Sequence, residues 1–485
     1  MGISKGKKGL AANSIMLTFV RVFTYVSSII QTMILSRALD KTQYGTYNQA
    51  YLVVSFVTPF LLLGLSNAVN YFYNQDGIDR KKYTNTIFTL VFAIGAIGAV
   101  IIALLRYPIT LYFSNNSLAP LILIVAVRPL LQNLIDFFQV LYVSSGKTNV
   151  IAVRNTIVSL VRLAIVVVAA YLLKNIVLIY VLLVITDFVQ VIVFHLYFNN
   201  KVMQVKLQKL NKNDLRPIFV YAIPLALSTA VGTISVHMDS LLIGRIMSTE
   251  DFAMYSNMAK ELPFNLLVSS FSTVIFPRII DLTSKGDKEN MLKAYRLYLE
   301  IGILLTWTLV GGAIVSSREL LVFLYSDKYI EGLPIFIVYL CVAGLRFTYY
   351  GALLSANGKS KEIFKYSVFS LICNLVLNLI MFYTIGIVGP AIATFVSMSL
   401  TGFLQIRRGS NIIDVKMKQL FDGKCLSSFF GLSLLWGVII TVIKHYISIR
   451  TPVISLAVYM GIYCGLIALI FKNRIIRDLK ELNRI

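Results

Sequence analysis

Charged residues are scarce in this sequence. They make up 14% of its 485 residues, whereas 57% are hydrophobic and the mean hydropathy is +0.77. This balance excludes a soluble globular chain and is typical of a membrane protein. Acidic residues are scarcest, 22 against 45 lysines and arginines, and the basic residues form short clusters between apolar stretches. We therefore expect no nucleic-acid partner, because no single basic face or domain is present.

Cysteine is also rare, and its four positions lack the spacing of metal ligands: Cys341, Cys373, Cys425 and Cys464. We expect neither a zinc site nor a disulfide framework, and no bound metal or other cofactor.

A complete nucleotide-binding loop is missing, although two segments resemble part of one. "SSGKTN" (144–149) and "ANGKSK" (356–361) contain Gly-Lys-Thr and Gly-Lys-Ser. The phosphate-binding loop needs a further glycine five positions earlier, where this chain has Leu141 and Leu353. The longest outer loop also lacks the acidic metal motif of a membrane glycosyltransferase. We therefore expect no ATP and no enzyme.

Long apolar runs fill the chain instead. Each covers about 18 to 27 residues, enough to cross roughly 30 Å of hydrocarbon as a helix. The sequence thus predicts an all-α polytopic protein of the cell membrane with about 14 transmembrane helices, at residues 11–36, 46–73, 84–105, 119–143, 150–173, 175–198, 218–244, 253–277, 297–315, 333–355, 366–384, 386–405, 426–443 and 453–471.

Basic residues set the predicted orientation of these helices. With the N-terminus inside, 30 of the 45 lysines and arginines fall in segments on the inner side, and only 9 in segments on the outer side. Cytoplasmic loops carry such an excess. We therefore expect both ends of the chain to be cytoplasmic.

The chain contains a duplicated pattern. "LSRALDKTQYGTYNQ" (35–49) is similar to "IGRIMSTEDFAMYSN" (243–257), 208 residues later, and the two Gly-Lys segments are 212 residues apart. Two matches at nearly one offset predict an internal repeat. Six spans in each half give parallel six-helix bundles at 1–198 and 218–405, joined by a basic cytoplasmic linker at 199–217. Residues 406–485 then hold two appended helices and a basic cytoplasmic tail.

Polar residues lie inside several predicted spans. In the first span they recur at steps of three and four, which draws one polar stripe along the helix: Ser14, Thr18, Arg21, Tyr25, Ser28 and Thr32. Ionisable residues at membrane depth usually face a cavity or a partner. Counting back from "SSGKTN" puts Arg128 level with Arg162, so an anion or Asp187 is expected between them. The same counting predicts an Asp136–Arg154 pair.

The second half contains its own set of charged positions within spans. Asp239 and Lys260 are expected at similar depth, Glu261 is adjacent to Lys260, and Arg346 lies in mid-span. An architectural ion pair and a role in ligand binding or gating are equally compatible with each of these positions.

The repeat, the segment 35–73 ("LSRALDKTQYGTYNQAYLVVSFVTPFLLLGLSNAVNYFY") and both Gly-Lys hairpins resemble the polysaccharide flippases of the multidrug/oligosaccharidyl-lipid/polysaccharide exporter superfamily, over residues 10–405. The resemblance implies a pair of six-helix bundles that alternates between inward-open and outward-open states. It implies transport of an undecaprenyl-diphosphate-linked oligosaccharide across the cytoplasmic membrane for capsule, O-antigen or exopolysaccharide synthesis. A glycan polymerase is a candidate partner.

With this resemblance, two groups of site residues are expected. The substrate-binding residues are Arg21, Arg128, Arg162, Lys260 and Arg346. The coupling or gating residues, with H⁺ or Na⁺ as the coupling ion, are Asp187, Asp239 and Glu261. Two related functions stay open: an organic-cation exporter of the same superfamily, which needs an acidic cavity, and a lipid II flippase, whose branch also has two appended helices.

Overall fold

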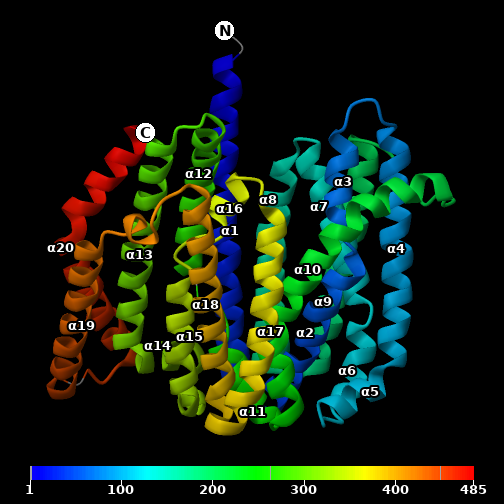
Figure 1. The fold of residues 1–485 in the computed structure, drawn as a ribbon. Helices are drawn as coiled ribbons and strands as arrows, with labels where there is room; N and C mark the ends of the chain where they lie inside the picture. The colour runs from blue at the N-terminus through cyan, green and yellow to red at the C-terminus, as the bar shows by residue number, and fades with distance from the viewer. Residues whose placement is uncertain (1–2, 263, 448, 485) are drawn as a thin grey trace. The chain divides into compact units, whose positions relative to one another are not determined.

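A computed structural model describes residues 3–262, 264–447 and 449–484 of the chain, and every regular element in these ranges is a helix. The helices fold into two compact units, Met1–Met254 and Tyr255–Ile485 (Figure 1). The prediction of an all-α multi-pass membrane protein is confirmed. The side chains of Ser14 and Thr18, which begin the predicted polar stripe, lie outside the described residues.

The first unit contains ten α-helices and the start of an eleventh. They are α1 (Ile3–Ala38), α2 (Lys41–Leu62), α3 (Leu65–Asn74), α4 (Arg80–Leu104), α5 (Arg106–Tyr112), α6 (Leu118–Val125), α7 (Arg128–Ser144), α8 (Thr148–Ile165) with a π-helical extension η1 (Val166–Leu172), α9 (Ile176–Lys201), α10 (Lys212–Ile246) and α11 (Thr249–Met258). Here α10 packs against α2 and α3. The repeat boundary at residues 199–217 stays a prediction about the duplicated sequence.

The second unit contains the rest of the helices. They are α12 (Phe264–Ser284), α13 (Lys288–Val315), α14 (Ser317–Tyr325), η2 (Asp327–Gly332), α15 (Leu333–Leu345), α16 (Ala352–Ala356), α17 (Ser360–Ile385), η3 (Gly386–Val388), α18 (Gly389–Ile412), η4 (Met417–Leu420), α19 (Gly423–Tyr446) and α20 (Pro452–Arg484).

Eleven segments in the described ranges are long and apolar enough to cross a membrane, or twelve if the bent pair α2 and α3 forms one span. One of the eleven, 360–412, contains two helices, α17 and α18, which pack side by side. The total of fourteen spans and the inner location of both ends stay predictions.

Four of the predicted spans contain a break in the helix inside the apolar run. The interruptions separate α2 from α3, α6 from α7, α11 from α12, and α15 from α16. Between α2 and α3 the axis bends by 41°. There Leu63 and Gly64 have φ values of 47° and 71°. A Cβ at Gly64 would lie 2.5 Å from the carbonyl oxygen of Ala222 in α10, so glycine permits both the turn and the close packing.

Local structure is the same at both copies of the repeated motifs. Asp40 caps α2 by accepting from the Gln43 amide at 2.7 Å, and Ser248, 208 residues later, accepts from the Asp251 amide at 3.1 Å. In the Gly-Lys hairpins Gly146 and Gly358 have φ values of 74° and 68°. The lysine amide after each glycine donates to a carbonyl five residues earlier, at 2.8 Å in both hairpins. Both pairs of equivalent segments therefore fold alike, as a duplicated unit requires.

The linker after α9 is fixed to the first unit. The amide of Gln208 donates to Thr89 Oγ1 at 3.1 Å, and that of Lys206 to Asn85 Oδ1 at 3.1 Å, so α4 holds the extended chain through polar side chains. An ion pair of 2.7 Å between Lys82 and Asp214 joins the start of α4 to the start of α10.

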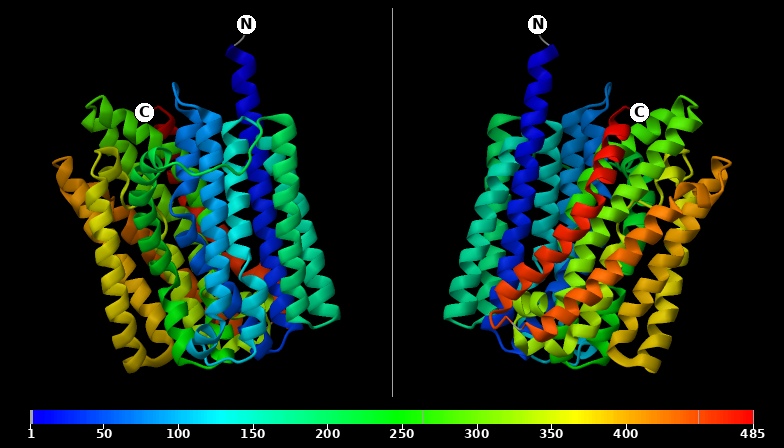
Figure 2. Two further views of the ribbon diagram at one scale, coloured as in Figure 1. Left: turned by 90° about the vertical axis from the view of Figure 1, so that its right-hand side faces the viewer. Right: turned by 90° about the vertical axis from the view of Figure 1, so that its left-hand side faces the viewer.

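The two appended helices pack on α13, and α20, red in Figure 2, runs along it. Two glycines allow this close approach. A Cβ at Gly311 would lie 2.2 Å from the hydroxyl of Tyr463, and one at Gly312 would lie 2.7 Å from Cys464 Sγ. Small residues at such crossings bring membrane helices together. At one end of α19, an ion pair of 2.6 Å joins Lys444 to Glu319 of α14.

Candidate functional site

Three charged residues from three helices of the first unit meet at Asp187. Arg128 donates through Nε to Asp187 Oδ2 at 3.1 Å, and Arg162 donates through its amino nitrogen to Asp187 Oδ1 at 2.9 Å. Arg128 and Asp187 are 4% and 0% exposed, whereas one third of the Arg162 side chain is exposed. Asp187 thus lies between the two arginines that the sequence places at one depth. We name these three residues the Asp187 cluster.

A second hydrogen-bonded group extends the Asp187 cluster along α8 and α9. Gln190 donates to Asp187 Oδ1 at 3.3 Å and accepts from Arg154 Nε at 2.8 Å. Arg154 also donates to Asn155 at 2.7 Å. The predicted Asp136–Arg154 ion pair is wrong for the residues that the structure describes, because Arg154 turns to the amide of Gln190 and Asp136 is exposed. Depth along a helix says nothing of the direction in which a side chain points.

Helix ends and aromatic rings position the arginines of the Asp187 cluster. Arg128 is the first residue of α7, directly after the break from α6, and Pro129 follows it. Its guanidinium lies 6.0 Å from the ring centroid of Tyr180, which stacks on Tyr47 at 5.0 Å. Tyr180 also donates to the Tyr47 carbonyl at 2.6 Å. Arg162 stands in the last turn of α8, just before the π-helical segment, a form that often occurs at functional positions.

The Asp187 cluster has an excess of positive charge. Two guanidinium groups share one carboxylate, and buried charge in membrane proteins is costly unless it is compensated. Among the described residues, the buried Nε of Arg162 has no hydrogen-bond partner. An unpaired donor beside a surplus cation is suited to an anionic oxygen, and arginine binds phosphate oxygens with paired donors.

The other predicted site residues are described within their own units. Arg21 is exposed on α1, and Asp239 is 6% exposed on α10. Arg346, at the end of α15, forms an ion pair with Glu261 in the segment between α11 and α12. Lys260, next to Glu261, is half-buried. Asp239 and Lys260 belong to different compact units, so their pairing stays a prediction.

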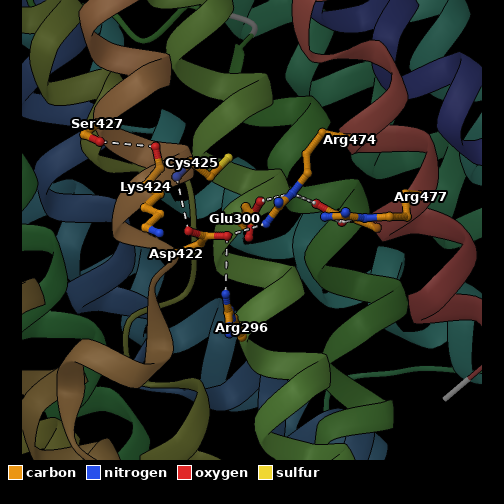
Figure 3. A network of polar contacts seen from close by, with 9 residues as sticks. Arg296, Glu300, Asp422, Lys424, Cys425, Ser427, Arg474 and Arg477 are labelled. Atoms are coloured by element: carbon orange, nitrogen blue, oxygen red, sulfur yellow. Dashed lines mark hydrogen bonds and ion pairs between the residues drawn. The ribbon is translucent and has the colours of Figure 1, made fainter.

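The second unit contains a polar network that the sequence analysis does not predict (Figure 3). Arg474 of α20 donates to Glu300 of α13 at 2.7 Å and to Asp422, which precedes α19, at 2.7 Å. It also pairs with Asp478 at 3.3 Å. Two features of the sequence point to this network. Glu300 lies at the start of the ninth predicted span, and Arg474 and Asp478 have the i, i+4 spacing of an ion pair on a helix. We name these four residues the Arg474 network.

The Arg474 network joins the appended helices to α13. Glu300 and Asp478 are 3% and 0% exposed, and Arg474 pairs with both of these buried carboxylates. No group of three or more metal-binding side chains occurs in the described part of the chain.

An all-helical, multi-pass fold with a buried charged cluster is typical of membrane transporters. Residues 34–334 match the polysaccharide biosynthesis protein family, and the chain belongs to this family.

Curated relatives agree with this assignment. The chain is 22% identical over 359 residues to the capsular polysaccharide biosynthesis protein CapF of Staphylococcus aureus, covering 73% of this chain and 87% of CapF. It is 22% identical over 268 residues to the probable low-salt glycan biosynthesis flippase Agl15 of Haloferax volcanii, covering 54% of each. It is 23% identical over 256 residues to the probable lipid II flippase MurJ of Rickettsia prowazekii, covering 49% of this chain and 48% of that one.

Solved structures share the fold. A lipid II flippase MurJ in an inward closed conformation matches with a TM-score of 0.76 at 15% identity, over 96% of this chain and 99% of that one. An inward-facing multidrug resistance MATE family transporter matches with a TM-score of 0.62 at 12% identity, over 82% and 98%. The predicted likeness to polysaccharide-exporting proteins is confirmed at the level of the family, and the predicted multi-pass membrane location is confirmed.

Proposed function

We propose that this protein moves an undecaprenyl-diphosphate-linked oligosaccharide from the inner to the outer leaflet of the cell membrane, for synthesis of a surface polysaccharide. The observation that carries the proposal is the pair of arginines on Asp187. Arg128 and Arg162 bring two positive charges to one carboxylate at 3.1 and 2.9 Å, which leaves one positive charge to be balanced. The diphosphate of the carrier lipid supplies anionic oxygens for it.

The two arginines have different roles in this proposal. Arg128 is almost fully buried against Asp187 and Tyr180, so it positions the carboxylate rather than touching the cargo. Arg162 is one-third exposed, so it is the arginine of the pair that contacts the diphosphate. Arg21, exposed on α1, and Lys260 and Arg346 of the second unit are proposed as further cationic contacts along the path.

Acidic residues are proposed to couple the transport cycle to H⁺ or Na⁺. The candidates are Asp187, Asp239 and Glu261. Glu261 pairs with Arg346, so protonation of Glu261 or binding of a cation to it would release Arg346 for the diphosphate. The cycle is alternating access without ATP: the sugar chain crosses through the polar interior and the polyprenyl tail stays in the bilayer.

Replacing Arg162 tests the assignment. Arg162→Ala is expected to abolish surface glycan in cells that depend on this gene, while the protein remains in the membrane. Arg162→Lys is expected to retain a minor part of the activity, because lysine keeps the charge but not the paired donors. Arg106→Ala, at a partly exposed arginine outside the Asp187 cluster, is the matched control.

Two further variants test the other proposed cationic contacts of the diphosphate. Arg21→Ala and Lys260→Ala are expected to reduce surface glycan without loss of inserted protein. Normal glycan with Arg162→Ala would overturn the diphosphate assignment.

The fold also favours a second candidate function. The flippase MurJ structure covers 96% of this chain, including the appended helices, which supports transport of lipid II. Deletion of the gene separates the two candidates. Loss of surface polysaccharide with normal growth supports the first proposal, whereas accumulation of peptidoglycan precursors and lysis support the second.

A further inference from the structure

The end of α20 and the start of α13 line an open basic pocket. Its volume is about 590 Å³, and it is lined by Asn290, Lys293, Arg477, Lys480, Glu481 and Arg484. We name it the α13–α20 pocket. Four of the six lining residues are cationic and one is acidic, and both helices belong to the second unit.

Two of the four cations already have carboxylate partners. Lys293 pairs with Glu481 at 2.5 Å, and Arg477 pairs with Asp478 at 3.3 Å. Lys480 and Arg484 are exposed, and no ion pair joins either of them to a carboxylate within the described ranges. The α13–α20 pocket therefore has an uncompensated double positive charge at its rim.

The final turns of α20 have three distinct faces. Phe471, Asp478 and Leu482 are buried against the protein at helical spacing. The basic residues of the pocket form a second face. Between them, Ile476 and Leu479 are 40% and 38% exposed, although both are apolar. An apolar strip beside a basic strip is typical of a helix lying at the boundary between acyl chains and headgroups.

The Arg474 network holds this part of α20 in place. Arg474 donates to Glu300 of α13 and to Asp422 at 2.7 Å each (Figure 3). Asp478, which pairs with Arg474, also accepts from Arg477 at 3.3 Å. The buried side of the helix end is thus fixed before any ligand arrives. A preformed pocket needs little ordering when it binds.

We propose that the α13–α20 pocket binds the phosphate headgroup of an anionic phospholipid in the leaflet at which α20 ends, the inner leaflet by the predicted orientation. Arg477 lies six residues, about 9 Å, beyond the last apolar residue of the span, Phe471, which corresponds to the headgroup layer. Basic pockets between helices at this level recognise such headgroups. The exposed Ile476 and Leu479 favour a lipid over free phosphate, because they contact acyl chains.

Lipid binding by the purified full-length chain in neutral detergent tests the proposal. Native mass spectrometry measures retention of added phosphatidylglycerol, with phosphatidylcholine as the neutral reference. Each cation near an anionic lipid contributes roughly a factor of five, so Lys480→Ala/Arg484→Ala is expected to weaken phosphatidylglycerol binding about thirtyfold. Lys418→Ala/Lys424→Ala removes two exposed cations outside the pocket and is expected to bind like the parent.

Three results would overturn the proposal. They are unchanged phosphatidylglycerol binding by the double variant, equal retention of phosphatidylcholine by the parent, and displacement of phosphatidylglycerol by millimolar inorganic phosphate, which would indicate a free-anion site. The single variant Lys480→Gln, with an expected loss of about fivefold, replaces the double variant if the latter melts at a lower temperature. The readout is independent of glycan export, so the proposed function and this site fail separately.

Discussion

Thr42 donates to Glu250 through a hydrogen bond of 2.9 Å, and the two residues are 208 positions apart, the offset of the repeated motif. Equivalent positions in the two copies of the motif therefore contact each other at the start of α2 and the start of α11. Thr42 is in the first turn of α2 and Glu250 in the first turn of α11. A contact between equivalent positions is what a local two-fold relationship produces.

Gly45 determines how close these two helix starts can be. A Cβ at this position would lie 2.1 Å from the carbonyl oxygen of Thr249, so backbone must move to admit it. Gly45→Ala is expected to destabilise the protein by about 1 to 3 kcal/mol, as overpacking does. Thermal unfolding in detergent measures the loss. Gly232→Ala, where no atom lies within 4 Å, is the control and is expected to be neutral or slightly stabilising. Equal melting temperatures for the two variants would contradict the close contact.

Asp187 compensates two arginines, so its removal is expected to be more damaging than removal of either partner. Asp187→Asn leaves Arg128, 4% exposed, without its counter-charge and is expected to cost about 3 to 5 kcal/mol. The double variant Asp187→Asn/Arg128→Gln is expected to recover part of that loss, because the buried charge is then absent as well. Unfolding temperatures of the parent, both single variants and the double variant measure this coupling. Strictly additive losses would show that Arg128 and Asp187 do not interact.

Acidic pH is expected to weaken the anchoring of the appended helices at Asp422. The hydrogen bond from Arg474, and then the bond from the Cys425 amide, hold the pKa of Asp422 below its ordinary value of about 3.9. A carboxylate with a depressed pKa contributes stability above its unfolded-state pKa and loses it as the pH falls through the folded-state pKa. Asp422→Asn keeps a capping side chain and removes the charge.

The pH series compares melting temperatures of the parent and Asp422→Asn. The parent is expected to be more stable at all values above about pH 5, and the difference is expected to shrink below about pH 4. Asp76→Asn, at a fully exposed carboxylate, is the control and is expected to differ little from the parent at any pH. A constant difference for Asp422→Asn down to the lowest pH would contradict a role for its charge.

Apolar run length predicts most of the helices, because a helix needs about twenty apolar residues to cross the hydrocarbon. It does not predict the breaks. The turn at Leu63 and Gly64 depends on the carbonyl of Ala222 in α10, a contact far away in the sequence. The break before Arg128 likewise lies within an uninterrupted apolar run, so only packing distinguishes it from a continuous span.

The Asp187 cluster was accessible from the sequence because the rise of a helix is constant. Counting from one hairpin gives the depth of Arg128 and Arg162 without any knowledge of neighbours. The rotation of each helix about its axis is not available in this way. Depth alone therefore predicts a pair of Arg154 with Asp136, whereas in the fold Arg154 donates to Gln190. Similarly, Glu300 and Arg474 are 174 residues apart, and no local pattern joins them.

Gly311 is expected to control the attachment of α20 to α13. An added Cβ would lie 2.2 Å from the hydroxyl of Tyr463 and 2.7 Å from its ring, and this tyrosine is only 2% exposed. The ring is enclosed and cannot swing away, so Gly311→Ala must displace α20 and is expected to cost about 1 to 3 kcal/mol. The matched control is Gly461→Ala in α20, where no atom lies within 4 Å. Thermal unfolding with limited proteolysis of the C-terminal segment measures both effects. If α20 becomes no more susceptible to cleavage in Gly311→Ala than in Gly461→Ala, the close packing at Tyr463 does not hold this helix in place.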